Sequence, residues 1–264
     1  VIKSIALGCF HSLILEDSGS SGSDRLFACG AGAPVGLLSE GDRSNIRVAQ
    51  PLTNLSRGTI TQIAAGMYHS IALYADGKVL AWGVGSQGRL GNHEFKDKTF
   101  VFPIPVKIGH GLQSEKVFTA FSLTKQSFFD ESERGAPREK DDRDKKQTGA
   151  KKPDWEIVQF ACGALHTAAR SQGGQLYVWG CNANGQLGLG ESQTYSWIPK
   201  KLAVGTRLVK EVAAGAEHCL VVTVAQELWA WGKGTDGQLG TGVARDEFEP
   251  QQISSLTGVM TCAA

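Results

Sequence analysis

The chain has 264 residues, 41% of them hydrophobic, so it can bury a substantial core, and its composition does not indicate wholesale disorder. Its 27 Lys and Arg residues nearly balance 26 Asp and Glu residues, which excludes the net basic charge of proteins held on nucleic acid or anionic membranes. No run of about 18 apolar residues could span a bilayer, and the N-terminus has no signal-peptide pattern, so we expect an intracellular protein, nuclear or cytoplasmic.

The first predicted strand leads into a Gly-x-x-His motif that recurs along the chain. Each copy has small or β-branched residues, a Gly, two variable residues, a His and then Ser, Thr or Cys, followed by an apolar run. Small residues suit a strand at the crowded inner edge of a sheet assembly, where backbones approach closely. The four copies are residues 5–12, 63–70, 160–167 and 212–219.

The next predicted strand is aromatic and ends in Gly, as Trp-Gly in three copies and Cys-Gly in the first. From the His to this Gly there are 14 residues in three copies and 19 in the first, where a stretch rich in Ser and Gly lengthens the turn. Turn dipeptides such as Asp76-Gly77 separate the two strands, as in a β-hairpin. The four copies end at Gly30, Gly83, Gly180 and Gly232.

A glycine loop and a proline-marked segment complete each unit. The loop has the pattern Gly-x-Leu-Gly at 88–91, 185–188 and 237–240, and the prolines are Pro51, Pro103 or Pro105, Pro199 and Pro250. No stretch shows a 3.6-residue apolar period over three turns, so we expect few helices. Units of about 50 residues with several short strands are typical of propeller blades.

This combination of Gly-x-x-His, Trp-Gly and Gly-Gln-Leu-Gly resembles the regulator of chromosome condensation repeat, over nearly the whole chain. The resemblance implies an all-β fold, a β-propeller with about four blades present, part of a seven-bladed ring. We place the repeats at about 1–58, 59–154, 155–207 and 208–258. Tryptophan-aspartate propellers are the rival architecture, but their Trp-Asp dipeptide is missing at the corresponding positions.

The second unit carries a large charged insertion. We predict a disordered segment at about 122–153, because the dense charge at 130–146, with no large apolar residue, cannot offset the ordering entropy. Its Lys145-Lys146 and Lys151-Lys152 pairs alternate with acidic residues, so nucleic acid or chromatin contact by this segment is not expected. Residues 262–264 match 212–214 and stop before the next Gly and His. We therefore expect a longer chain, or a partner, to complete the ring.

We assign the invariant repeat residues structural roles and predict no catalytic, cofactor-binding or metal site. The dinucleotide-like pattern Gly-x-Gly-x-x-Gly at 83–88 and 232–237 opens no helix, and one His per blade is better placed to bond neighbouring backbone than to share an ion. The structural repeat positions are Gly8, His11, Gly30, Gly66, His69, Trp82, Gly83, Gly88, Gly91, Gly163, His166, Trp179, Gly180, Gly185, Gly188, Gly215, His218, Trp231, Gly232, Gly237 and Gly240.

The six cysteines form no Cys-x-x-Cys pair and sit in small-residue strands, so we expect buried reduced thiols. A light-sensing branch of the family carries Gly-Trp-Arg-His-Thr. This chain has Met67-Tyr68, Ala164-Leu165 and Ala216-Glu217 at the two variable positions, which argues against photoreception.

We expect a scaffold or targeting module that binds other proteins. The resemblance implies two alternatives: nucleotide exchange on a small GTPase of the Ran type, which the founding family member performs, and partner binding within a large ubiquitin ligase.

Overall fold

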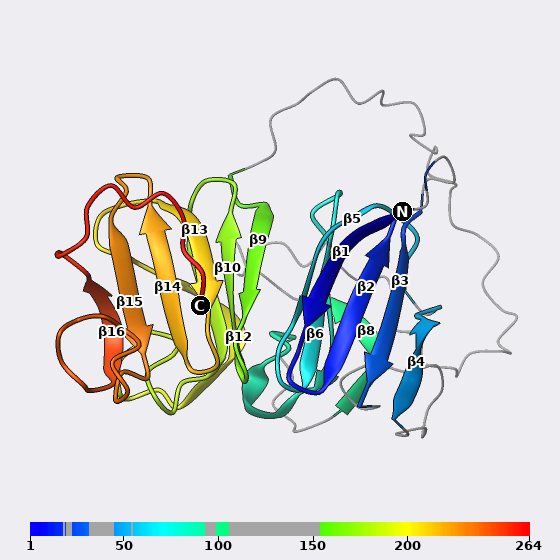
Figure 1. Ribbon diagram of the computed structural model, residues 1–264, viewed down its shortest axis with the longest axis horizontal. Coiled ribbons are helices and arrows are strands. Elements are labelled where there is room, and N and C mark those ends of the chain that lie inside the picture. The colour runs from blue at the N-terminus through cyan, green and yellow to red at the C-terminus, as the bar shows by residue number, and fades with distance from the viewer. Residues whose placement is uncertain (18, 20–22, 32–44, 54, 93–98, 106–153) are drawn as a thin grey trace, which may run out of the picture. The chain divides into compact units, whose positions relative to one another are not determined.

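The computed structural model describes residues 1–17, 19, 23–31, 45–53, 55–92, 99–105 and 154–264, and these contain four antiparallel sheets (Figure 1). Each sheet has four strands that pair in sequence order, so every sheet is a meander. The strands of the first sheet are β1 (Ile2–Leu7), β2 (His11–Glu16), β3 (Arg25–Gly30) and β4 (Ile46–Pro51). Those of the second are β5 (Ile60–Ala65), β6 (His69–Tyr74), β7 (Val79–Val84) and β8 (Thr99–Pro105).

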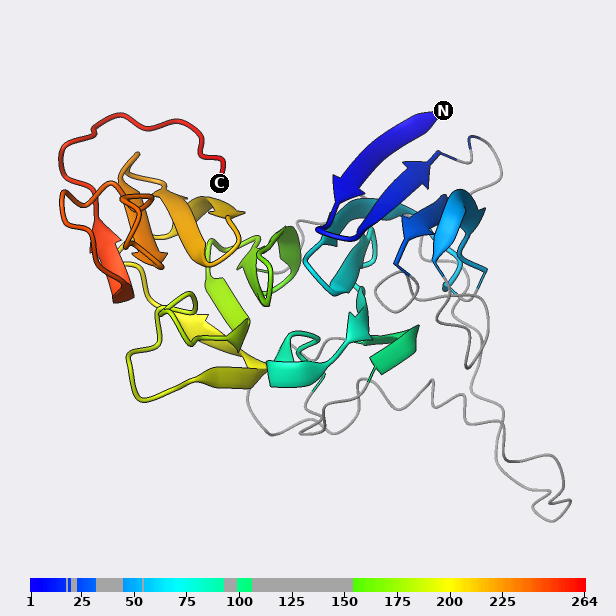
Figure 2. The same cartoon turned by 60° about the horizontal axis from the view of Figure 1, so that its bottom comes forward.

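The third and fourth sheets repeat this arrangement (Figure 2, where the fourth is orange to red). The third has β9 (Ile157–Cys162), β10 (His166–Ser171), β11 (Leu176–Cys181) and β12 (Tyr195–Leu202), and the fourth has β13 (Val209–Ala214), β14 (His218–Thr223), β15 (Leu228–Gly232) and β16 (Glu247–Gln252). Of the described residues, only the 3₁₀ turn η2 (Ser86–Gly88) forms a named helical element. No helix among them could cross a membrane. The predicted insertion at about 122–153 lies outside the described residues.

The constant spacing of the repeat sets the strand register. The His that begins the second strand pairs with the Gly at or near the end of the aromatic strand in every sheet, as in His69 with Gly83 and His166 with Gly180. Gly83 has a φ of 108°, and a Cβ at this position would overlap the carbonyl oxygen of Tyr68. Only glycine fits such a left-handed, crowded position without strain. The longer turn of the first unit leaves the register unchanged, because His11 still pairs with Gly30.

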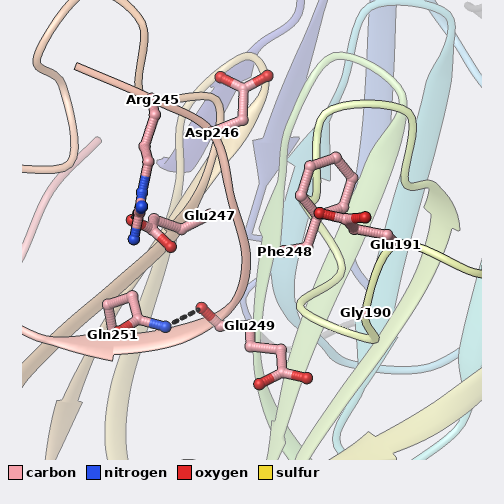
Figure 3. A pocket seen from close by; sticks show the side chains of 8 residues that line it. All are labelled: Gly190, Glu191, Arg245, Asp246, Glu247, Phe248, Glu249 and Gln251. Atoms are coloured by element: carbon pink, nitrogen blue, oxygen red, sulfur yellow. Dashed lines mark hydrogen bonds and ion pairs between the residues drawn. The ribbon is translucent and has the colours of Figure 1, made fainter. Parts of the chain in front are cut away.

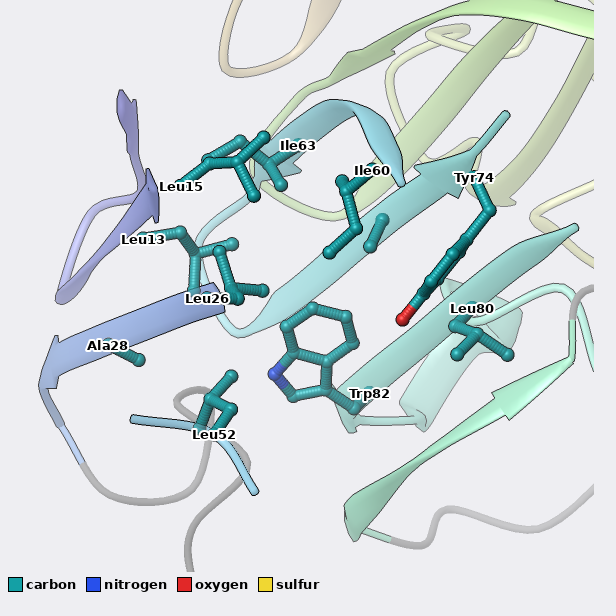
Figure 4. Packing of buried hydrophobic residues seen from close by; sticks show 11 residues of the cluster. Leu13, Leu15, Leu26, Ala28, Leu52, Ile60, Ile63, Tyr74, Leu80 and Trp82 are labelled. Carbon is teal, nitrogen blue, oxygen red and sulfur yellow. The ribbon is translucent and has the colours of Figure 1, made fainter. Parts of the chain in front are cut away.

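The hydrophobic core lies between successive sheets. Leu13 and Leu15 of the first sheet pack with Ile60, Ile63 and Trp82 of the second (Figure 4). Equivalent clusters join the second sheet to the third and the third to the fourth. Because the middle strands bury both faces, β6 is buried at all six positions rather than alternating. Each sheet therefore packs its side chains against those of the next sheet in the chain.

A tryptophan from each of the last three sheets anchors these clusters. Trp82, Trp179 and Trp231 are 0% exposed. The indole Nε1 of Trp179 donates to the carbonyl of Arg89 at 3.1 Å, and that of Trp231 donates to the carbonyl of Gln186 at 3.1 Å. Both acceptors belong to the glycine loop of the preceding sheet. The ring thus fills a core while its polar atom fixes a loop, and replacing such a Trp by Ala costs about 3–5 kcal/mol.

Candidate interaction surface at the Gly-x-x-His loops

The Gly-x-x-His motifs form the loops between the first and second strands of the sheets, at residues 8–10, 66–68, 163–165 and 215–217. We call these four loops the loop row. Backbone hydrogen bonds join the last three: Met67 N donates to Ala164 O at 3.0 Å, and Ala164 N donates to Ala216 O at 2.9 Å. Loops of different sheets thus hold one another in place.

Within each sheet, the residue before the His is fixed by a second backbone bond. Its carbonyl accepts from the N–H of the residue that follows the aromatic-strand Gly, at 2.8–2.9 Å in all four sheets. The donor and acceptor pairs are Ala31 and Phe10, Val84 and Tyr68, Cys181 and Leu165, and Lys233 and Glu217. The loop row is therefore a rigid base for the side chains that it presents.

Beneath the loop row, the histidines join the sheets through side chains. His11 Nε2 lies 2.8 Å from Ser70 Oγ, and His69 Nε2 lies 3.0 Å from Thr167 Oγ1. His166 Nε2 lies 3.1 Å from Cys219 Sγ. In each case the partner is the residue after the next sheet's His. The sequence predicted backbone partners for these rings, whereas the structure gives three of them side-chain partners.

Burial keeps these imidazoles neutral. Desolvation lowers the pKa of His11 to about 4 and that of His166 to about 3, and together with the nearby Arg89 charge it lowers the pKa of His69 well below 6.5. The Nδ1 atoms of all three are buried without a hydrogen-bond partner. A ring protonated at Nε2 leaves only a lone pair unsatisfied at Nδ1, whereas the other tautomer would bury an unpaired N–H. The geometry therefore favours Nε2–H as the donor across each junction.

The motif glycine makes room for its own histidine. A Cβ on Gly66 would overlap the imidazole of His69 and lie 2.6 Å from the carbonyl oxygen of Gly163 on the next sheet. Gly8, Gly163 and Gly215 meet their histidines in the same way. The Gly and the His of the motif are therefore one packing unit that sets the spacing of neighbouring sheets.

At the first two sheets the loop row displays aromatic side chains. The rings of Phe10 and Tyr68 stack with centroids 5.3 Å apart at an interplanar angle of 22°. The guanidinium carbon of Arg89 lies 5.9 Å from the Tyr68 centroid, within range of a cation–π interaction. Phe10 is 50% exposed, although Tyr68 partly covers it. This side of the loop row offers an aromatic contact with a buried cation behind it.

The loop row changes chemistry along its length. The third sheet presents the partly exposed Leu165, and the fourth presents an ion pair, in which Lys233 Nζ lies 3.2 Å from Glu217 Oε2. The Glu217 carboxylate raises the pKa of Lys233 through this hydrogen bond and its charge. The loop row therefore has an aromatic end, an aliphatic middle and a charged end, so a partner would meet different chemistry at each end.

The described residues contain no group of three or more His, Cys, Asp or Glu side chains that could hold a metal ion. The His166–Cys219 pair has the composition of a nucleophilic dyad, but Cys219 is 0% exposed and burial raises the pKa of its thiol. Its Sγ also donates to Gln186 O at 3.5 Å, so the thiol serves as a link in a hydrogen-bond chain.

The glycine loops hold adjacent sheets together. A Cβ on Gly88 would overlap Ser196 O of the third sheet, and one on Gly185 would lie 2.6 Å from Glu247 O of the fourth. The Gly-x-Gly-x-x-Gly pattern at 83–88 ends in the η2 turn rather than at the start of an α-helix. The remaining predicted loop glycines, Gly91, Gly188, Gly237 and Gly240, also have positive φ.

Sequence analysis missed the side chains that give the loop row its chemistry: Phe10, Tyr68, Arg89, Glu217 and Lys233. They occupy positions whose residue type differs between repeats, so a comparison of the repeats finds no common residue there and assigns these positions no role. A usable signal was present, because the invariant Gly and His of the motif enclose two positions that change in size and charge from repeat to repeat.

Two family models for the regulator of chromosome condensation repeat match the chain. One matches residues 173–222 and 227–264, and the other matches 60–89, 157–186 and 209–238. Among similar proteins, the ultraviolet-B receptor UVR8 of Arabidopsis thaliana is 30% identical over 96% of this chain and 46% of its own length. The human probable E3 ubiquitin-protein ligase HERC6 is 28% identical over 95% of this chain and 20% of its own length.

Solved structures show the same fold. Human WBSCR16 has a TM-score of 0.67 at 22% identity, covering 96% of this chain and 52% of that one. Prp20p of Saccharomyces cerevisiae has a TM-score of 0.66 at 21% identity, covering 96% and 50%. The chain thus spans about half the length, or less, of these relatives. Its four sheets are β-propeller blades, and the chain belongs to the regulator of chromosome condensation repeat family.

Proposed function

We propose that the chain is a protein-interaction module whose loop row binds a partner protein. The observation that carries the proposal is the Phe10–Tyr68 stack, with Phe10 half exposed on a loop whose backbone is fixed. Aromatic residues and arginine are enriched at the energetic centres of protein interfaces, and a rigid base lowers the entropy cost of binding.

The relatives support a binding role rather than one shared reaction. UVR8 is named as a receptor and HERC6 as a probable ubiquitin ligase, and the chain corresponds to 46% and 20% of them. What this chain shares with both is the propeller. Light reception is not proposed, since Trp82, Trp179 and Trp231 lie in separate sheet junctions and the loop row carries no tryptophan.

Substitutions in the loop row test the proposal. We would compare co-purifying proteins for the unmodified chain, Phe10→Ser and Glu217→Lys, with Val48→Ser as the control. Val48 is 69% exposed on β4, so this control also removes an exposed apolar side chain. We expect at least one partner to bind the chain directly from purified components and to lose tenfold or more affinity with Phe10→Ser but not with Val48→Ser. Equal binding by all variants would contradict the proposal.

Nucleotide exchange on a Ran-type GTPase remains a second candidate. It is favoured by the structural likeness to Prp20p, which has been described together with its binding to Gsp1p and histones. Release of a fluorescent guanine nucleotide from a Ran-type GTPase, with and without the chain, tests it. Acceleration well above background would replace the general binding role with this activity, and no acceleration would remove the candidate. Ubiquitin-ligase targeting predicts instead that the partner found above is ubiquitinated.

A further inference from the structure

A second surface, separate from the loop row, lies where the glycine loop of the third sheet meets β16 of the fourth. Two hollows of about 430 and 490 Å³ adjoin there, because Glu249 lines both. Gly190 and Glu191 border the first hollow, and the preceding residues Gly188 and Leu189 border the second. We call this combined feature the edge groove. Its acidic end is shown in Figure 3.

The acidic end has more carboxylates than cations. Glu191, Asp246, Glu247 and Glu249 line it together with a single cation, Arg245. Arg245 Nε already pairs with Glu247 Oε1 at 2.8 Å, and the two side chains lie together in Figure 3. Asp246 Oδ1 accepts from Gly234 N at 2.9 Å, while Glu191 and Glu249 make no ion pair within the described part of the chain. Since the whole chain has a net charge of +1, this is a local negative patch.

The other end of the groove is apolar. Leu189, Trp229 and Pro250 line it, and all three are partly exposed. Gly205 allows the indole to reach the wall, because a Cβ there would lie 2.8 Å from Trp229 Cζ2. The indole Nε1 of Trp229 donates to Glu227 Oε2 at 3.4 Å, which fixes the ring by its polar edge. A partly exposed, fixed tryptophan beside proline and leucine suits an apolar side chain of a ligand.

The backbone of β16 offers little for strand addition, although β16 is the edge strand of its sheet. Phe248 O already accepts from Gly190 N at 3.0 Å, and Pro250 has no N–H to donate. An occupant must therefore be recognised through its side chains. The apolar hollow adjoins the carboxylates of Glu191 and Glu249, which make no ion pair within the described residues. The complementary ligand therefore has an apolar residue next to Lys or Arg.

We propose that the edge groove binds an extended peptide segment of a partner protein, with an apolar side chain against Trp229 and a basic side chain against Glu249 and Glu191. Charge complementarity selects a basic peptide over an acidic one, and the apolar end distinguishes it from a simple polycation. The edge groove shares no lining residue with the loop row, so it would act as a second contact for the same or another partner.

Fluorescence anisotropy with labelled peptides tests this proposal. The probe is Gly-Leu-Pro-Leu-Gly-Lys-Arg-Lys-Gly, together with the reversed sequence because the direction of binding is open. One comparison peptide replaces each Leu by Ser, and another replaces each basic residue by Glu. We expect saturable binding of at least one Leu-containing basic probe, with five-fold or greater loss for either comparison peptide. Equal binding of the Ser peptide or of spermine would overturn the proposal, as would no binding of either probe.

Variants of the chain locate the binding. Glu249→Lys should weaken the probe at least five-fold, whereas Asp236→Lys, at an exposed carboxylate of the same sheet outside the groove, should change affinity less than two-fold. Phe10→Ser should leave peptide binding intact, which separates this result from the loop-row test. Circular dichroism confirms that each variant is folded. Equal losses for Glu249→Lys and Asp236→Lys would show nonspecific attraction and overturn the proposal.

Discussion

Ser70 Oγ lies 2.8 Å from Nε2 of His11, which belongs to the preceding sheet, and both side chains are buried. Ser12 occupies the same repeat position in the first sheet, but none of the cross-sheet histidine bonds of the described residues goes to its side chain. The two serines are therefore a matched pair: one bonds across a junction and the other does not.

Ser70→Ala should lower the free energy of unfolding by about 1–3 kcal/mol, because it leaves a buried imidazole N–H without an acceptor. Ser12→Ala should change it by less than about 0.5 kcal/mol, as for ordinary surface substitutions. Urea unfolding followed by tryptophan fluorescence measures both. Equal costs for the two substitutions would show that the cross-sheet bond contributes little.

Stability should fall in mild acid. An unfolded histidine binds a proton below about pH 6.5, whereas folded His11 resists protonation until about pH 4. Between these values the unfolded chain binds more protons, so the free energy of unfolding decreases as pH falls, by up to about 3 kcal/mol for His11. Urea unfolding at intervals from pH 7.5 to 4.5 measures this slope. His11→Gln should reduce the slope without abolishing it, because His69 and His166 also resist protonation in the folded chain. An unchanged slope in that variant would contradict the assignment to His11.

Gly66→Ala should be far more damaging than an ordinary glycine substitution. The added methyl would overlap the His69 ring and press on Gly163 O, so we expect a loss above about 3 kcal/mol or a failure to fold. Gly237→Ala is the control, because a Cβ there meets nothing within 4 Å and its φ of 80° costs only about 1–2 kcal/mol. Thermal unfolding of both variants, with soluble yield for Gly66→Ala, gives the comparison. Similar losses would refute the close-packing argument.

Cysteine substitutions should show that Cys219 acts through its hydrogen bonds. Cys219→Ser keeps a polar partner for His166 and should cost about 1 kcal/mol or less, whereas Cys219→Ala should cost about 1–3 kcal/mol more than the serine variant. Urea unfolding measures the difference, and equal stabilities would contradict it.

Thiol labelling of the native chain gives an independent check. Cys9 is exposed, whereas Cys219 is fully buried with a raised pKa, so a thiol reagent followed by mass spectrometry should modify Cys9 well before Cys219. Early modification of Cys219 would mean that the contact between the third and fourth sheets opens readily.

The fold within each sheet could be predicted from the sequence because strand length and turn length fix register. The spacing from His69 to Gly83 recurs from His166 to Gly180, and both pairs face each other across a hairpin. Contacts between sheets could not be predicted in this way. The partner of His69 is Thr167, 98 residues away, and repeat spacing alone does not say which face of a sheet meets its neighbour.

The candidate surfaces were harder still to predict. Phe10 and Tyr68 stack only because successive sheets bring variable positions together, and Glu191 and Glu249 line one hollow from two different sheets. Repeat comparison finds what is common to all units, while binding chemistry lies in what differs between them.

The cross-sheet histidine bonds also give the stack a polarity. At each of the three junctions between described sheets, the earlier unit presents an imidazole and the later unit presents a hydroxyl or thiol. A unit duplicated in tandem would therefore meet a suitable partner on both sides, whichever copy was duplicated. Gene duplication could lengthen such a protein one blade at a time without redesigning any junction, which leaves the exposed loop positions free to diverge.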